Sequence, residues 1–193
     1  DGAKTIEDSL DMAREAVKEG IHTIIATPHH KNSCYENPRE VVLQKVGELN
    51  ETLNENKIEL IILPGQETAL HGDILENVQL GNILTLNQTQ YIFIELPAGH
   101  VPRYTHQVLF EMQNRGMIPI IVHPERNRGI MEQPEILYQL IKRGALAQLT
   151  ASSICGVFGK NIKKFSQRLV EANLVHFIAS DAHNHKTRPF KMA

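Results

Sequence analysis

Residues 118–126 read Ile-Pro-Ile-Ile-Val-His-Pro-Glu-Arg, an apolar run of five residues that stops abruptly at a histidine and a proline. Short, β-branched apolar runs of this kind are typical of buried strands that lead into a loop. A helical pattern precedes the run at 101–115 and ends at Gly116, and another follows at 135–143 and ends at Gly144. The sequence therefore predicts a strand between two helices, the repeating unit of a parallel sheet.

The same alternation extends in both directions along the chain. Thr5, with an acidic residue three positions later, has the signature of a helix N-cap. Further strands are predicted at 21–27, 58–63, 83–86, 91–96, 145–149 and 175–179, and further helices at 5–20, 37–53, 73–78 and 161–172. The fold class is therefore α/β, and because no Ser/Gly linker or low-complexity stretch divides the chain, we predict one domain over residues 1–193.

Composition excludes several classes of protein. Among 193 residues, 41% are hydrophobic, and 20 basic residues stand against 22 acidic ones, so there is no excess of basic charge for binding nucleic acid. Cys34 and Cys155 cannot form a disulfide framework, which favours a reducing compartment. No apolar run approaches the roughly 18 residues of a membrane span. We therefore expect a cytoplasmic protein without a nucleic-acid partner or membrane insertion.

The predicted strands end at residues that can bind metals. The polar residues at six strand ends are His29, Glu67, Glu95, His123, Thr150 and Asp181, and five of the six carry imidazole or carboxylate groups. Folding does not require such residues there, and the carboxyl ends of parallel strands share one face. The pattern predicts a convergent site for Mn, Fe or Zn, in which Glu67 could bridge two ions. The other histidines outside the Ser-Asp-Ala-His stretch at 180–183 are expected to be ordinary, with His30 and His185 as candidates for contacts just outside the ligands.

Arginines accompany this cluster and point to a phosphorylated substrate. Arg126 lies three residues after His123, and Arg188 lies five residues after His183. Guanidinium groups match phosphate oxygens in a bidentate manner. Neither cysteine has an arginine six positions later, as a cysteine phosphatase requires. The chain also lacks a Gly-x-Ser-x-Gly motif, a Walker loop and a Gly-x-Gly-x-x-Gly motif, which excludes three other enzyme classes.

Together these motifs resemble the polymerase and histidinol phosphatase (PHP) superfamily, and within it the capsule-type, manganese-dependent tyrosine-protein phosphatases of Gram-positive bacteria. The resemblance covers nearly the whole chain. It rests on Asp-Gly-Ala at 1–3, Ala-Thr-Pro-His-His at 26–30, Gly-Gln-Glu at 65–67, Phe-Ile-Glu-Leu-Pro at 93–97, His-Pro-Glu-Arg at 123–126, Ser-Asp-Ala-His at 180–183 and Arg-Pro at 188–189.

The resemblance implies a fold, a reaction and a set of site residues. The fold is a distorted, seven-stranded, TIM-like βα barrel, and the reaction is hydrolysis of phosphotyrosine on the bacterial tyrosine autokinase that controls capsule or exopolysaccharide synthesis. The cofactor is manganese, with iron or zinc as alternatives, as two to three ions. Glu95 is a ligand or a proton-handling group, and Arg126 and Arg188 contact the phosphate. The implied metal ligands are Asp1, His29, Glu67, His123, Asp181 and His183.

The sequence departs from the family pattern at its two ends. Members of the family begin with a strand ending in His-x-His, directly before the Asp-Gly that is found here at 1–2, and they continue with a helical segment after the position of Arg188. We therefore expect a domain truncated at both ends, without its first strand and with one metal position weakened or empty.

Two other functions stay open. The chain could be a different PHP phosphoesterase, such as a histidinol-phosphate phosphatase, whereas a nuclease-like member is disfavoured by the net charge of -2. It could also be an inactive module that binds a phosphorylated partner, because the N-terminal His-x-His is absent. Metal content and a comparison of substrates distinguish these functions.

Overall fold

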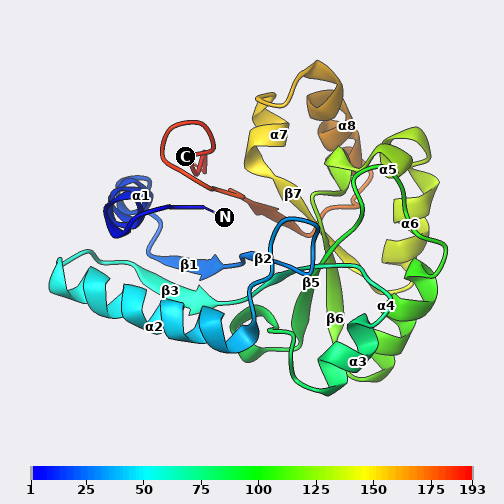
Figure 1. The fold of residues 1–193 in the computed structure, drawn as a ribbon. Helices are drawn as coiled ribbons and strands as arrows, with labels where there is room; N and C mark the ends of the chain where they lie inside the picture. Colours follow the sequence, from blue (N-terminus) through cyan, green and yellow to red (C-terminus); the bar gives the residue numbers. More distant parts are fainter. Residues whose placement is uncertain (1, 193) are drawn as a thin grey trace.

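The computed structural model describes residues 2–192, and Figure 1 shows its strands at the centre with helices around them. The strands are β1 (Thr23–Ala26), β2 (His29–His30), β3 (Ile61–Pro64), β4 (Glu67–Ala69), β5 (Tyr91–Glu95), β6 (Ile118–Val122), β7 (Leu146–Thr150) and β8 (Phe177–Ala179). The helices are α1 (Ile6–Lys18), α2 (Arg39–Glu55), α3 (Ile74–Gln79), α4 (Thr105–Asn114), α5 (Arg128–Glu132), α6 (Glu135–Lys142), α7 (Ala151–Cys155) and α8 (Lys160–Glu171), with 3-10 turns η1 (Leu86–Gln88) and η2 (Pro124–Arg126).

Every strand pairing is parallel, which confirms the predicted α/β class. Strands β1 and β3 form a two-stranded sheet, and the second sheet has the order β2-β4-β5-β6-β7-β8. A closed barrel of seven strands is not found within residues 2–192. The second sheet stays open because β2 and β8 lie at its opposite edges and do not pair with each other.

The two sheets are joined by two matching interruptions. Strand β1 leads into β2 through Thr27 and Pro28, and β3 leads into β4 through Gly65 and Gln66. A side chain at Gly65 would place its Cβ 3.0 Å from methyl carbons of both Ile25 and Leu86. A Cβ here would be tighter than most such contacts, so glycine permits the close packing of the chain at 65 against Ile25 and Leu86.

The hydrophobic core has two main parts, which lie on either side of the interruptions between β1 and β2 and between β3 and β4. The larger lies between β5–β7 and helices α3, α4, α6 and α8, and includes the fully buried Ile94 and Ile121. The second joins α1 and α2 to β3 and to Phe190 in the C-terminal segment. The C-terminal segment therefore lies beside α1 (Figure 1), where the backbone N–H of Met192 also donates to the Glu19 carboxylate at 2.9 Å.

Helix α1 begins where the sequence predicted. Thr5 is the N-cap: its Oγ1 accepts from the backbone N–H of Asp8 at 3.1 Å, and the Asp8 carboxylate accepts from the backbone N–H of Thr5 at 3.2 Å. This capping box satisfies donors that the first turn of a helix leaves unpaired.

The strand predicted at 83–86 is wrong. Ile83 and Leu84 are buried, which explains the apolar signal, but no strand pairs with them. The backbone N–H of Leu84 instead donates to the side-chain Oε1 of Gln66 at 2.6 Å, and the turn η1 follows. A buried side-chain amide therefore replaces the ladder hydrogen bond that a strand would have made.

None of the helices within residues 2–192 is long and apolar enough to cross a membrane.

Candidate metal and phosphate site

The strand ends place the predicted residues side by side. His29 is directly opposite Glu67 in the β2–β4 register, and Glu95 is opposite Ala69, two residues along β4 from Glu67. His123 follows β6 directly, and its backbone N–H donates to Gln148 on β7 at 2.8 Å. The parallel register, rather than any contact along the sequence, therefore brings these side chains together.

Four of them form what we call the metal-ligand cluster: His29, Glu67, Glu95 and His123. The His123 Nε2 lies 2.8 Å from Glu67 Oε1, and the His29 Nε2 lies 3.5 Å from the same oxygen and 3.9 Å from Glu95 Oε1. Ligand atoms of His29, Glu67 and Glu95 all lie within 4.8 Å of one another. Two imidazoles converging on a shared, buried carboxylate are a donor set that suits Mn, Fe or Zn, so the residues present fit such an ion.

Burial shifts the proton equilibria of two groups at this site. Burial, and next the nearby charge of Glu67, raises the pKa of Glu95, because both disfavour its carboxylate form. Burial, and next the charge of Arg188, lowers the pKa of His183. At neutral pH His183 is therefore held in the uncharged form that a metal ligand requires.

A second group, which we call the arginine pair, comprises Arg126 and Arg188 on either side of Asp181. The Asp181 Oδ2 accepts from Arg126 Nη2 at 2.7 Å and from Arg188 Nη2 at 2.6 Å. Thr150 Oγ1 lies 3.5 Å from the same oxygen. In this structure Asp181 therefore organises the two guanidinium groups, and its predicted role as a metal ligand stays a prediction.

His183 lies between the two groups. Its Nδ1 is 3.0 Å from the Asp181 carbonyl oxygen, and its ring centroid is 5.9 Å from that of His29. Its predicted role as a ligand also stays a prediction. Asp1, which was predicted as a further ligand, lies outside the described residues.

The backbone after β6 is held by a residue that the sequence analysis did not select. His123 has a left-handed backbone (φ 36°, ψ 49°), and the next two residues begin η2. Glu125 is completely buried, and its Oε1 accepts from Ser153 Oγ at 2.6 Å and from the Thr150 backbone N–H at 3.1 Å. Glu125 thus ties η2 to the first turn of α7. No motif signals this role, because it depends on donors 25 and 28 residues away.

Two aromatic residues at the rim were also missed. Tyr35 stacks on the His29 ring with centroids 5.9 Å apart, and the Arg126 guanidinium lies 5.5 Å from the ring centroid of Phe158. Tyr35 lies between β2 and α2 and Phe158 between α7 and α8, so neither is one of the polar residues at strand ends from which the site was predicted. Tyr35 packs against the imidazole of His29, and Phe158 packs against the guanidinium of Arg126.

A cavity of about 250 Å³ opens onto both groups of residues. It is lined by His29, Glu95, Leu96, Ala98, Val122, His123, Pro124, Arg126, Asn127 and Arg188. Its walls therefore include metal-capable side chains, two cations and four apolar residues.

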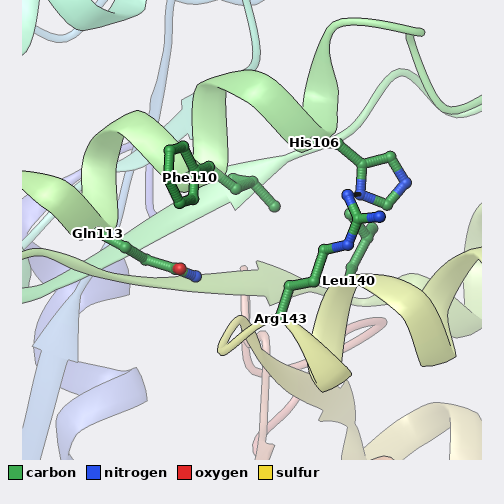
Figure 2. A pocket seen from close by; sticks show the side chains of 6 residues that line it. His106, Phe110, Gln113, Leu140 and Arg143 are labelled. Carbon is green, nitrogen blue, oxygen red and sulfur yellow. Dashed lines mark hydrogen bonds between the residues drawn. The ribbon is translucent and has the colours of Figure 1, made fainter.

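A larger cavity of about 420 Å³ lies elsewhere, between α4 and α6. Figure 2 shows His106, Phe110 and Gln113 of α4 facing Arg143 and Leu140 across it. The cavity has one histidine and no carboxylate among its lining residues, so it cannot supply a ligand set like that of the metal-ligand cluster. The smaller cavity is therefore the candidate reaction site.

Comparison with known proteins gives a consistent result. The family model described as "Capsular polysaccharide synthesis, CpsB/CapC" matches residues 1–193. The chain is 52% identical over 190 residues to tyrosine-protein phosphatase YwqE of Bacillus subtilis, covering 98% of this chain and 75% of that protein. It is 31% identical over 194 residues to tyrosine-protein phosphatase CpsB of Streptococcus agalactiae serotype V, covering 98% and 80%. A solved structure from a set of YwqE (B. subtilis) and CpsB (Streptococcus pneumoniae), described as metal-dependent tyrosine phosphatases, matches with a TM-score of 0.95 and 51% identity, covering 98% of this chain and 77% of that one.

Proposed function

Because the chain belongs to the CpsB/CapC family of capsular polysaccharide synthesis, we propose that it is a metal-dependent phosphatase that hydrolyses phosphotyrosine. Its protein substrate is then the tyrosine autokinase that controls capsule or exopolysaccharide synthesis. One observation carries the proposal: a single cavity is lined both by members of the metal-ligand cluster and by the arginine pair. Metal-assisted hydrolysis of a phosphate ester needs these two kinds of group within reach of one phosphorus atom.

The metal-ligand cluster would hold the ions. His29, Glu67, Glu95 and His123 are the ligands that the geometry supports, with Glu67 in the bridging position because both imidazoles approach its Oε1. Asp1, Asp181 and His183 complete the proposed set for two to three ions, of manganese in preference to iron or zinc. When bound, such ions supply Lewis-acid stabilisation of the phosphoryl oxygens and an activated water as nucleophile.

The arginine pair would bind the phosphoryl group. Arg126 and Arg188 both line the cavity, and the Arg126 Nε has no hydrogen-bond partner among residues 2–192. Each guanidinium now shares the single oxygen Asp181 Oδ2, which leaves further N–H donors for phosphate oxygens. Because these donors are already held in place, they can stabilise charge that develops on the phosphoryl oxygens without reorganisation.

The apolar walls suit an aromatic ester. Leu96, Ala98, Val122 and Pro124 line the same cavity as the two arginines, so a phenyl ring can lie against them while its phosphate reaches the cations. A phenolate is a fairly good leaving group, and acid assistance from Glu95 or His183 contributes modestly. These walls favour phosphotyrosine over histidinol phosphate, whose imidazole and amine are polar.

The proposal also covers the cellular compartment and the strand that would complete the barrel. Cys34 and Cys155 are both exposed free thiols, which suits the reducing cytoplasm. The distorted barrel of the superfamily would require a further strand to join the unpaired edges of β1 and β8.

Replacement of Arg126 tests the proposed function. Loss of one preorganised donor of this kind lowers kcat about 100-fold, so Arg126→Ala should nearly abolish turnover of a phosphotyrosine peptide while the metal content per chain stays unchanged. Arg128→Ala is the matched control, because Arg128 is exposed on α5 and pairs with Glu132.

The alternatives give different results in the same assays. Loss of bound metal in Arg126→Ala would assign Arg126 a structural role. Faster turnover of histidinol phosphate than of the peptide would indicate the other PHP phosphatase. Less than one metal per chain, together with no hydrolysis, would indicate a module that binds a phosphorylated partner.

A further inference from the structure

Helix α8 packs against the turn that carries Arg126, and it has three lysines for which residues 2–192 supply no acidic partner. Lys160, Lys163 and Lys164 lie within about 100° of one another around the helix axis, and all three are exposed. Phe165 and Leu169, on the opposite side of the helix, are buried in the core. We call these three residues the α8 lysine face.

Several cations of other helices have acidic partners, whereas within residues 2–192 those of the α8 lysine face have none. Arg14 pairs with Asp11 on α1, Lys45 with Glu48 on α2, and Arg128 with Glu132 on α5, all at 2.8–2.9 Å. Within residues 2–192, no carboxylate lies at ion-pair distance from Lys160, Lys163 or Lys164. In a chain whose net charge is -2, this local excess of three positive charges is not a consequence of composition.

This face is connected to the reaction site by direct packing. The turn η2, which ends at Arg126, packs against α8, and the Arg126 guanidinium lies over Phe158, two residues before the first residue of the helix. The stem of Lys163 lies over Gly156, with its Cδ 3.0 Å from where a Cβ would stand. Figure 1 shows α7 and α8 side by side beyond the end of β7. The lysines therefore lie on a helix that packs against the turn carrying Arg126.

From these observations we infer that the α8 lysine face binds an acidic segment of the protein substrate next to its phosphotyrosine. This inference rests on the proposed function and adds to it a recognition element outside the cavity. Three residues of extended chain span about 10 Å, and successive turns of a helix are about 5 Å apart. Aspartate or glutamate side chains within a few residues of the phosphotyrosine can thus reach the lysines while the phosphate contacts Arg126.

A membrane surface fits this face less well. Helices that lie on membranes insert a broad apolar face below their basic residues. The apolar face of α8 is instead occupied by the core of the protein, so Phe165 and Leu169 are not available for insertion. Binding to anionic lipid is nevertheless measured as a separate outcome of the test.

The test compares three phosphate esters and two variants with equal charge change. The substrates are a phosphotyrosine peptide with Asp and Glu at the flanking positions, the same peptide with Ser and Gln there, and p-nitrophenyl phosphate. The test variant is Lys160→Gln/Lys163→Gln/Lys164→Gln. The control is Lys18→Gln/Lys45→Gln/Lys142→Gln, which removes three cations from α1, α2 and α6. Binding of each peptide is measured by fluorescence anisotropy and turnover as kcat/KM.

Three exposed ion pairs together change affinity by about tenfold, so the intact protein should bind the acidic peptide about tenfold more tightly than the neutral one. The test variant should lose this preference, and it should hydrolyse p-nitrophenyl phosphate at the original rate. Salt should weaken the preference in the intact protein, because exposed charges are screened. The control variant should behave as the intact protein does.

Several results would overturn the inference. It fails if the preference persists in the test variant, if the control variant loses it equally, or if the lysines are needed for binding phosphatidylserine vesicles but not the acidic peptide. Failure of the intact protein to hydrolyse p-nitrophenyl phosphate, with lysine-dependent binding of the acidic peptide retained, would instead contradict the proposed function and leave the binding surface supported.

Discussion

The carboxylate of Glu125 gives the sharpest prediction about stability, because it is completely buried and its two oxygens differ. Its Oε1 accepts two hydrogen bonds, from Ser153 Oγ and from the backbone N–H of Thr150, whereas no hydrogen-bond partner for Oε2 is found within residues 2–192. Glu125→Gln keeps an acceptor at Oε1 and removes a buried charge. Glu125→Ala removes the acceptor, so that two buried donors lose their partner.

The expected magnitudes follow from these contacts. Each buried donor without a partner costs about 1–3 kcal/mol, so Glu125→Ala should lower the free energy of unfolding by about 4 kcal/mol. For a domain of this size, that lowers the midpoint of thermal unfolding by about 10 °C. Glu125→Gln keeps the Oε1 acceptor but places an NH2 group where Oε2 has no partner within residues 2–192, so it should lower the free energy of unfolding by about 1–2 kcal/mol, less than Glu125→Ala.

Thermal and urea unfolding, monitored by circular dichroism, measure both variants. A double-mutant cycle with Ser153→Ala isolates the 2.6 Å hydrogen bond, and residues in direct contact should show a coupling of about 1–2 kcal/mol. Equal destabilisation by Gln and Ala would refute the reasoning, since the Oε1 contacts would then not be what stabilises η2. Additive effects of Ser153→Ala and Glu125→Ala would refute it as well.

Two further predictions concern the cluster and the sheet. Because burial raises the pKa of Glu95, protons compete with metal at this group, and Mn²⁺ affinity measured by calorimetry between about pH 5 and 8 should rise with pH. Glu95→Gln should bind Mn²⁺ more weakly and with a flatter pH profile. An unchanged pH profile in this variant would contradict the role of Glu95 as a ligand. Gly65→Ala should lower the free energy of unfolding in urea by about 1–3 kcal/mol, because the added Cβ clashes with Ile25 and Leu86. Gly47→Ala on α2, where no atom lies within 4 Å of the added Cβ, should raise it by about 0.5–1 kcal/mol. Equal effects of the two substitutions would show that the packing at Gly65 is not tight.

The sequence predicted those parts of the site that depend on strand order. His29 and Glu67 follow the strands predicted at 21–27 and 58–63 and are the first residues of the short strands β2 and β4, whereas Glu95 is the last residue of β5; the parallel register brings the three together. The alternation of strands and helices likewise predicted the α/β class. Both inferences need only local periodicity and the rule that parallel strands share a carboxyl edge.

Other features depend on contacts that local patterns do not contain. The first two predicted strands are each divided, into β1 and β2 and into β3 and β4, and at this division Gly65 packs closely against Ile25 and Leu86. The false strand at 83–86 arose because buried apolar residues look alike whether a strand or the Gln66 side chain satisfies their backbone. The pairing of Asp181 with Arg126 joins residues 55 positions apart, and the sequence motifs assigned these residues to separate roles.

The site also contains backbone strain, and this connects its stability to its geometry. His123 and Asp181 each follow a strand and each has a positive φ, 36° and 51°. A left-handed conformation costs a residue other than glycine about 1–2 kcal/mol. It persists only where the surrounding contacts determine it.

Those contacts are present at both positions. The backbone N–H of His123 is bound to β7, and Glu125 fixes the turn that follows. Asp181 is fixed by two guanidinium groups on one carboxylate oxygen. Because each strained turn directs a side chain back over the end of its strand, the anchoring contacts and the reactive groups form one unit. The arginine pair thus holds Asp181 in its strained turn, and under the proposed function the same two residues would present their remaining N–H donors to a phosphate in the cavity.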